Sequence, residues 1–372
     1  LLEHLMFRGT PTFPDGSFDS ILAQKGGLNN AFTTEDFTVY TSCVTFDGVE
    51  DVLMLEADRW QNLAISDDVF EIERNVVLEE RSLRVDCHAL GKAYERLQYQ
   101  ALGGEPYGHP VIGWREDLER LTCADIHRHY ARARQTSRML LVLAGGITVE
   151  QAVEKVVRCF GDLPVSSEEP FWPVLASAEP VPLLRASHSV MEEPSGYSYL
   201  LCCYRLPREG HPDYEACELL TRIVGDGESC RLYDRFVRET RQFLEVWTNY
   251  ESQAREHPLF WAGFAVAQNF DDRDARDTVA TYLENLHLSL TEEELAKAKR
   301  SWLAEEAFGT DELEDWSLDI ASRVVLMRWN QVWESEKRME SVTLDDLKRV
   351  ARLYLRVSGM VSLALQGQPG EL

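Results

Sequence analysis

Apolar residues recur every three or four positions between residues 67 and 83, and this spacing predicts an amphipathic helix that ends near Glu80. Two aspartates open the segment, as is usual in the first turn of a helix. One face of the helix should therefore be buried. The predicted buried stripe consists of Val69, Ile72, Val76 and Leu83.

Glu73 and Glu80 fall on the same face of this predicted helix, because seven residues make almost two turns. A buried carboxylate is unfavourable unless it is paired, hydrogen-bonded or bound to a metal. The pattern leaves two interpretations of Glu80. It is either a functional carboxylate or an exposed residue at the edge of the stripe, equivalent to its neighbour Glu79.

The rest of the chain mixes strand and helix patterns. Threonine, tyrosine and valine alternate between residues 36 and 46, which is typical of a strand, whereas residues 49–63 show the apolar spacing of a helix. Between Pro164 and Pro182, which include five of the 14 prolines, neither pattern continues. In chain order we expect helices that end at Gly9 and Gly26, strands at 29–33 and 36–46, helices at 49–63, from 67 to near 80, at 88–101 and at 124–134, and a buried strand at 139–144.

The second half of the chain repeats the first. A shift of 221 residues gives seven identities within the 28 positions 119–146, and in both copies a capped helix precedes an apolar strand. We therefore expect an α+β fold of two similar domains, each an antiparallel sheet with helices on one face. The domains would be residues 1–165 and 183–372, with a linker at 166–182. The identities pair Glu119, Thr122, Asp125, Arg128, Ser137, Met139 and Gly146 with Glu340, Thr343, Asp346, Arg349, Ser358, Met360 and Gly367.

The charge balance is strongly acidic. The 372 residues include 38 lysines and arginines against 63 aspartates and glutamates, which gives a net charge of −25. This balance argues against nucleic-acid binding, which requires clustered positive charge. It fits general solubility, or a chamber that attracts cationic peptides. The longest apolar run, 139–144, is far shorter than the roughly 18 residues of a membrane helix, so we expect no membrane span.

The eight cysteines form no C-x-x-C pair and no disulfide-rich framework. Cys202 and Cys203 are adjacent in an apolar, strand-like run, where successive side chains point to opposite faces. We expect free, buried thiols. This cysteine usage favours the cytoplasm, with the periplasm as the alternative.

Glu3 and His4 match the last two letters of H-x-x-E-H, in which two histidines on one helix face bind zinc and the glutamate acts on bound water. The first histidine of the motif would immediately precede Leu1. A glutamate beside a histidine is also common on solvated helix faces, so the pair alone does not establish a metal site. Three longer strings add to it: EHLMFRGT at 3–10, GGLNNAFT at 26–33 and IERNVVLEE at 72–80.

In this order and spacing, the three strings resemble the insulinase/pitrilysin family, most closely its short two-domain branch related to mitochondrial processing peptidase. The resemblance continues through Pro106-Tyr107-Gly108 and covers essentially the whole chain. It implies a zinc-dependent metalloendopeptidase that hydrolyses unfolded or short peptides in a chamber between two domains. The implied cofactor is Zn²⁺.

The resemblance also implies roles for individual residues. In the family, the third zinc ligand lies 76 positions after the second histidine of the motif, and that position is Glu80. His4 and Glu80 are therefore the predicted zinc ligands, and Glu3 is the predicted general base. Glu73 is expected to orient the ligands by hydrogen bonding.

The implied substrate contacts are less complete. Asn30 and Ala31 would lie on an edge strand whose backbone pairs with an extended peptide, although the sequence alone equally favours a turn at Asn30. In the second domain the family carries an arginine and, seven residues later, a tyrosine that hold the substrate carbonyl. Here Arg238 is present and Glu245 occupies the tyrosine position. An ionised carboxylate donates no hydrogen bond, so either Tyr250 substitutes after a local shift or a second homologous subunit supplies the Arg/Tyr pair.

A function of another class also fits the resemblance. Relatives with eroded metal motifs serve as non-catalytic binding or scaffold subunits of two-chain peptidase complexes. The presence of Glu3, His4, Glu73 and Glu80 argues against this alternative, because a scaffold has no use for all four.

Overall fold

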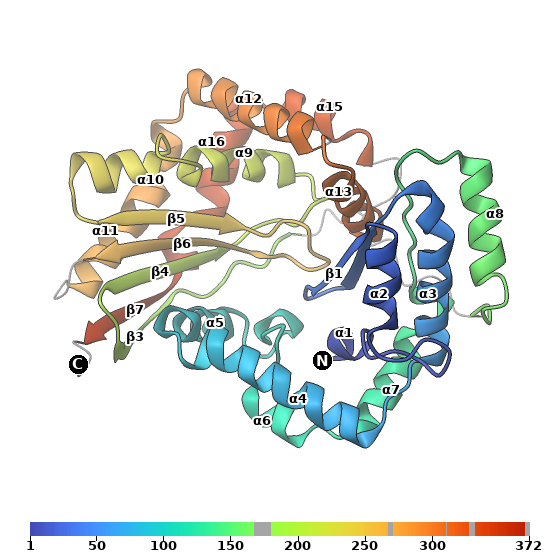
Figure 1. The fold of residues 1–372 in the computed structure, drawn as a ribbon. Coiled ribbons are helices and arrows are strands. Elements are labelled where there is room, and N and C mark those ends of the chain that lie inside the picture. The colour runs from blue at the N-terminus through green and yellow to red at the C-terminus, as the bar shows by residue number, and fades with distance from the viewer. Residues whose placement is uncertain (167–179, 267–270, 310, 327–331, 369–372) are drawn as a thin grey trace. The chain divides into compact units, whose positions relative to one another are not determined.

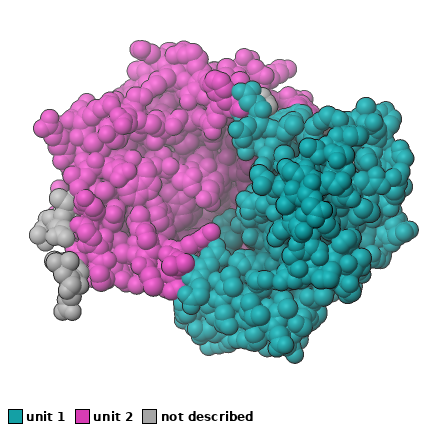
Figure 2. Space-filling view, viewed as in Figure 1, with its two compact units in different colours: residues 1–81, 111–173, 309–325 teal, residues 82–110, 174–308, 326–372 magenta. Residues whose placement is uncertain are grey.

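The computed structural model describes residues 1–166, 180–266, 271–309, 311–326 and 332–368. The chain folds into two compact units, shown in different colours in Figure 2. Unit 1 comprises residues 1–81, 111–173 and 309–325. Unit 2 comprises residues 82–110, 174–308 and 326–372.

Unit 1 is made of helices around a small antiparallel sheet. Strand β1, Leu28–Thr33, pairs with strand β2, Thr38–Cys43, and the register places Ala31 opposite Tyr40. The other elements of unit 1 are α1 (Leu2–Leu5), α2 (Ser17–Gln24), η1 (Phe46–Gly48), α3 (Val49–Asn62), α4 (Asp67–Arg81), α6 (Arg115–Arg120), α7 (Cys123–Ala133), η4 (Thr136–Arg138), α8 (Val149–Phe160) and α13 (Leu313–Leu326, of which the last residue belongs to unit 2).

Helix α4 forms as predicted, but of the predicted buried stripe only Val69 packs, partly buried, against the core. Ile72 and Val76 are 56% and 43% exposed, and Leu83 lies beyond the helix, where it is exposed too. Successive residues of a helix point about 100° apart, so the predicted and observed faces are neighbours. The observed face is buried because the large ring of Phe70 packs with Leu5 in the core. The residues of α4 that are buried are Phe70, Glu73, Val77 and Arg81.

The buried strand predicted at 139–144 is also wrong. These residues form no strand, and Leu140, Leu141 and Leu143 are exposed. Their counterpart after the 221-residue shift, strand β7 (Val361–Gln368), lies between two partner strands in unit 2. In the described part of unit 1 no strand pairs with 139–144, so its backbone groups have no ladder to join.

Unit 2 is built on a five-stranded sheet with the order β3-β7-β4-β6-β5. Neighbouring strands are antiparallel, except β3 and β7, which are parallel. The remaining strands are β3 (Ser187–Pro194), β4 (Ser198–Arg205), β5 (Glu245–Tyr250) and β6 (Leu259–Val266). The helices are η2 (Ser82–Asp86), α5 (Ala89–Leu102), η3 (Pro106–Gly108), α9 (Tyr214–Gly225), α10 (Arg231–Tyr233), η5 (Asp234–Glu239), α11 (Asp272–Asn285), η6 (Leu286–Leu288), α12 (Glu292–Gly309), α15 (Ser335–Ser341), α16 (Leu344–Tyr354) and η7 (Val357–Gly359).

Helices lie on both faces of this sheet (Figure 1). Helices α9, α11 and α16 pack on one face, around the rings of Phe236, Phe243 and Phe264. Helix α5 packs on the other face through Ala93 and Leu97. The predicted α+β class is confirmed. Two finer parts of the prediction are wrong for unit 2: its sheet is mixed rather than antiparallel, and helices cover both of its faces rather than one.

The capped helix of the internal repeat is confirmed in both copies, whereas the strand predicted to follow it forms only in the second copy. Helices α7 and α16 have the same length and begin 221 residues apart, and each begins with a capping box, Thr122 with Asp125 and Thr343 with Asp346. The segments 82–110 and 309–325 lie at positions related by nearly the same shift. Segment 82–110, from the first half of the chain, belongs to unit 2, and segment 309–325, from the second half, belongs to unit 1. Most of the predicted linker lies outside the described residues, and the predicted domain boundaries stay a prediction.

All eight cysteines are free, as predicted, but only four of them are buried. The buried ones are Cys202, Cys203, Cys217 and Cys230, and burial raises the pKa of Cys202 to about 12. These thiols are therefore protonated and behave as small apolar side chains. Within the described residues, no helix has the length and apolarity needed to cross a membrane.

Gly263 in β6 offers a test of the packing in unit 2. It lies opposite Trp247, and a Cβ atom at this position would approach Cε2 of the indole to 2.2 Å. The indole Nε1 donates to the Tyr94 hydroxyl, which holds the ring in place. We expect Gly263→Ala to lower the free energy of unfolding by about 1–3 kcal/mol, because overpacking forces the ring to move. Urea unfolding measures the change. Gly196→Ala is the control, since its Cβ would meet open space. Equal stability of the two variants would contradict the prediction.

Candidate metal centre

Glu3, the predicted general base, and His4, a predicted zinc ligand, lie on α1, a helix of only four residues. A helix this short does not form by itself in water, so tertiary packing must hold it. Leu5 and the following Met6 supply that packing, because both are buried in the core of unit 1 with Phe70 of α4. The position of His4 relative to α4 therefore follows from the core beneath it.

His4 lies between two carboxylates of α4. Its Nδ1 atom is 3.3 Å from Oε2 of Glu73, and its Nε2 atom is 3.4 Å from Oε2 of Glu80. The side chain of Glu73 is 3% exposed, whereas His4 and Glu80 are about one quarter exposed. The structure thus brings together three of the residues that the sequence analysis assigned to the site, with the imidazole between the two acids.

The buried charge of Glu73 is compensated by Arg8. Nε of Arg8 donates to Oε1 of Glu73 at 2.6 Å, and a second guanidinium nitrogen forms an ion pair with the same oxygen. Arg8 also contacts Asp15, with 3.2 Å between Nη1 and Oδ2. The Glu73 carboxylate raises the pKa of Arg8 above its usual value. One oxygen of Glu73 therefore serves Arg8 and the other faces His4, which fixes the orientation of the carboxylate.

Glu3 points toward the sheet of unit 1. Its Oε2 atom accepts a hydrogen bond from the hydroxyl of Thr33, the last residue of β1. The Thr33 hydroxyl also lies 3.3 Å from that of Thr38 on β2. The predicted proton acceptor is therefore held at the end of the strand that carries Asn30 and Ala31.

Asn30 lies within β1, so the alternative of a turn at this position is wrong. Its Oδ1 atom accepts the backbone N–H of Ala31 at 2.9 Å. The backbone of Ala31 lies opposite Tyr40 of β2. Within the described residues β1 pairs with β2 alone, so its other edge carries backbone groups outside any ladder.

The donor atoms of His4 and Glu80 fit a metal ion. Two atoms that each lie about 2.0–2.1 Å from a tetrahedral zinc are about 3.3 Å apart, close to the 3.4 Å between Nε2 of His4 and Oε2 of Glu80. A catalytic zinc normally has three protein ligands. Among the described residues, no group of three His, Cys, Asp or Glu side chains is arranged to hold a metal. His4 and Glu80 are thus two side chains at a separation that would suit a metal ion, and the described residues bring no third donor to them.

The predicted substrate-binding residue Arg238 lies in unit 2, on the π-helical turn η5. Its Nη1 atom donates to Asp234 at 2.7 Å, and its Nη2 atom is 3.5 Å from Glu228. Glu245 begins β5 and is exposed. Tyr250 cannot easily replace the missing tyrosine, because its hydroxyl donates to the carbonyl of Pro207 and burial raises its pKa.

Two residues of the site were missed by the sequence analysis. Arg8 neutralises Glu73, and Thr33 holds Glu3. Both lie inside strings that carry the family resemblance, EHLMFRGT and GGLNNAFT. The signal for Arg8 was available in principle, since a buried glutamate on α4 requires a cation nearby. No pattern in the sequence points to Thr33.

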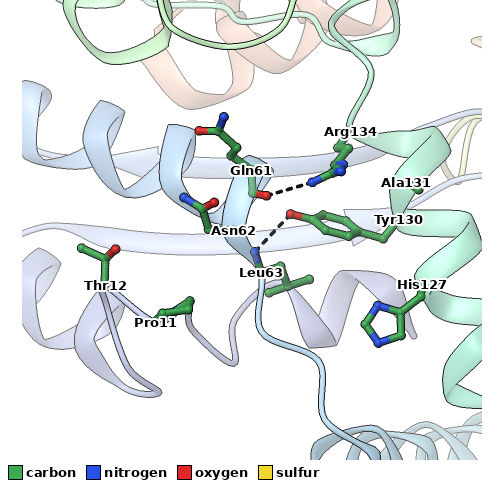
Figure 3. Close-up of a pocket in the computed structure, with 9 residues that line it drawn as sticks. All are labelled: Pro11, Thr12, Gln61, Asn62, Leu63, His127, Tyr130, Ala131 and Arg134. Atoms are coloured by element: carbon green, nitrogen blue, oxygen red, sulfur yellow. Dashed lines mark hydrogen bonds between the residues drawn. The ribbon is translucent and has the colours of Figure 1, made fainter.

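A cavity of about 560 Å³ lies elsewhere in unit 1, where the end of α3 meets α7. Figure 3 shows hydrogen bonds that join Arg134 and Tyr130 to the main chain at the end of α3. Arg134 donates to the carbonyl of Gln61 at 3.0 Å, and the Tyr130 hydroxyl accepts the backbone N–H of Leu63 at 3.1 Å. These contacts cap the carboxyl end of α3. None of the predicted site residues lines this cavity.

Comparison with known proteins finds relatives that match almost the whole chain. The zinc protease PqqE of Helicobacter pylori is 26% identical over 358 residues, which cover 96% of this chain and 80% of the relative. The probable mitochondrial-processing peptidase subunit beta of Schizosaccharomyces pombe is 26% identical over 360 residues, 94% of this chain and 78% of the relative. The crystal structure of a protease from Helicobacter pylori matches with a TM-score of 0.89 over 98% of this chain and 88% of that chain, and at 24% identity it shows a shared fold.

Two family models match successive parts of the chain. The model described as insulinase (peptidase family M16) matches residues 1–114, and the model described as peptidase M16 inactive domain matches residues 120–301. Together they span well over half of the sequence. The chain therefore belongs to the insulinase family of peptidases.

Proposed function

We propose that this protein is a zinc-dependent metalloendopeptidase that hydrolyses unfolded or short peptides. The observation that carries the proposal is the position of His4, with Nε2 at 3.4 Å from Glu80 and Nδ1 at 3.3 Å from Glu73. An imidazole that donates Nδ1–H to a carboxylate presents the lone pair of Nε2 to a metal. His4 and Glu80 would hold the ion.

The residues around His4 have separable roles in this proposal. Glu73 fixes the tautomer of His4, and Arg8 holds the Glu73 carboxylate in its orientation. Zinc, when bound, polarises a carbonyl and lowers the pKa of water. Glu3 takes up a proton at its carboxylate and passes it to the departing amine. The Thr33 hydroxyl holds that carboxylate at the end of β1.

The edge of β1 is the proposed binding place for the peptide backbone. Strand addition binds main-chain groups and therefore tolerates many sequences, as unfolded peptides require. The N–H of Ala31 is bonded to the side chain of Asn30, which must turn away before this group can reach a peptide carbonyl. Asn30 would then be free to contact the peptide itself.

A histidine placed directly ahead of Leu1 should complete the zinc site. It would lie one helical turn before His4 and would add the third ligand to His4 and Glu80. We expect the chain with this added histidine to bind one zinc ion, and a chain with an added alanine at the same place to bind zinc much more weakly. Competition with a chromogenic chelator measures both affinities. Equal affinities would contradict the proposal and leave the non-catalytic subunit as the better hypothesis.

Substitutions should separate proton transfer from metal binding. In the histidine-extended chain, Glu3→Gln should keep zinc and lose peptide hydrolysis by about 10²-fold or more, because an amide accepts no proton. Glu80→Gln should weaken zinc binding. Loss of a residue that hydrogen-bonds to a metal ligand weakens binding by roughly 10- to 100-fold, and loss of a ligand itself should cost at least as much. Exposed Glu79 on the same helix provides the control, as Glu79→Gln should change neither quantity. Near-normal turnover of Glu3→Gln would require another base.

We further propose that the active protein has a second homologous subunit. Glu245 stands where the resemblance calls for a hydrogen-bond donor, and the Tyr250 hydroxyl is already committed to Pro207. A carboxylate would repel the negative charge that develops on the substrate oxygen. A partner that carries the Arg/Tyr pair would remove this defect.

The partner proposal predicts a gain of activity from one substitution. In the histidine-extended chain assayed alone, Glu245→Tyr should raise peptide hydrolysis, because one oxyanion donor contributes about 10²- to 10³-fold. Glu245→Phe is the matched control, which removes the repulsion but supplies no hydroxyl. A chain that turns over at full rate alone, with no change on Glu245→Tyr or Tyr250→Phe, would refute the need for a partner.

A further inference from the structure

The residues that follow the short helix α1 are anchored on α3. The guanidinium carbon of Arg59 lies 5.3 Å from the centroid of the Phe7 ring, and the hydroxyl of Thr10 donates to the carboxylate of Asp58. Between these two anchors, the carbonyl of Gly9 accepts the N–H of Ala64 at 3.2 Å, just beyond the end of α3. Two adjacent residues of α3 thus clamp the segment 7–10 from both ends.

Arg59 is enclosed by aromatic rings. Its side chain is 3% exposed, and its guanidinium carbon lies 4.6 Å from the centroid of Phe18 and 4.5 Å from that of Tyr40, in addition to Phe7. Its Nε and Nη2 atoms donate to the carboxylate of Glu56 at 2.7 and 2.5 Å. Its Nη1 atom has no hydrogen-bond partner among the described residues, so the ring faces are what compensates it.

This cage connects the parts of the proposed site. Phe7 lies three residues after His4, Phe18 belongs to α2, and Tyr40 belongs to β2, where it pairs with Ala31. One guanidinium therefore touches both the segment that follows the metal ligand and the strand opposite the proposed peptide-binding position. Because α1 has only four residues, its own hydrogen bonds cannot fix where His4 points.

We propose that Arg59, together with Asp58, is a positioning residue for the metal centre, which sets the place of His4 against Glu73 and Glu80. The segment that carries His4 would then be held in two ways: by the packing of Leu5 and Met6, and by the contacts of Arg59 and Asp58. Its consequence for catalysis rests on the proposed function, but the placement of the segment 2–10 does not.

Hydrogen exchange of the metal-free chain tests this placement directly. The double variant Glu56→Gln/Arg59→Met removes the guanidinium without leaving an unpaired buried carboxylate. We expect the amides of residues 2–10 to exchange at least about tenfold faster than in Glu56→Gln alone, because the cage no longer holds them. The amides of α4 and α7 should keep their rates. Mass spectrometry of peptic fragments resolves these segments.

Two further variants separate positioning from general stability. Arg59→Lys keeps a cation within the rings and should restore most of the protection of residues 2–10. Arg205→Met removes an equally buried arginine in unit 2, paired with Glu105, and should leave residues 2–10 unaffected. If the double variant does not fold, Phe18→Leu removes one ring of the cage and should still speed exchange in 2–10, while α4 and α7 keep their rates.

Zinc affinity provides the second measurement. In the histidine-extended chain, loss of Arg59 should weaken zinc binding by about 10- to 100-fold, as for other residues that orient a ligand. Unchanged exchange of residues 2–10, or an equal rise across α4 and α7, would overturn the proposal. If exchange in 2–10 rises and zinc fails to bind even to the parent chain, the positioning role stands and the proposed function falls.

Discussion

The site depends on one buried charge. Glu73 is 3% exposed, and a carboxylate in that setting is tolerated only when its oxygens are fully engaged. Arg8 takes one oxygen and His4 faces the other, so the charge ties α4 to the segment that carries Glu3 and His4. The same requirement explains why the α4 face with Phe70 and Glu73 is buried, although the adjacent face of the same helix carries more aliphatic residues. The number of apolar residues on a helix face therefore predicts burial less well than the packing of one large ring and the pairing of one buried charge.

Much of this arrangement could be predicted from the sequence, and the reasons for the exceptions differ. The helix of Glu80, the strands at 28–33 and 38–43 and the two capped helices of the repeat are local patterns, and they were confirmed. The strand at 139–144 failed because pairing is a property of partners, which the segment itself does not encode. The closeness of His4 to Glu73 and Glu80 came from family spacing rather than from periodicity. The Arg59 cage could not be predicted, because its members come from four separate segments.

The motif string at 3–10 acquires a physical meaning from these contacts. Its glutamate and histidine carry the proposed chemistry, while the four residues FRGT attach them to the rest of unit 1. Phe7 meets Arg59, Arg8 meets Glu73, and Thr10 meets Asp58. Gly9 has a φ of +85°, and a Cβ there would lie 2.6 Å from the carbonyl oxygen of Phe13, so the turn accepts no other residue without strain.

The composition of the two units has a consequence for how the chain reaches this state. Unit 1 includes residues 309–325, and unit 2 includes residues 82–110, so neither unit is complete until more than four fifths of the chain exists. During synthesis, the amino-terminal half emerges without the helix that completes it, and α5 emerges long before the sheet that it covers. Completion of either unit therefore requires contacts between residues far apart in sequence, and such contacts form late and leave apolar surface exposed for longer. A nascent chain of this protein carries the apolar face of α5 uncovered until the strands of unit 2 have been made.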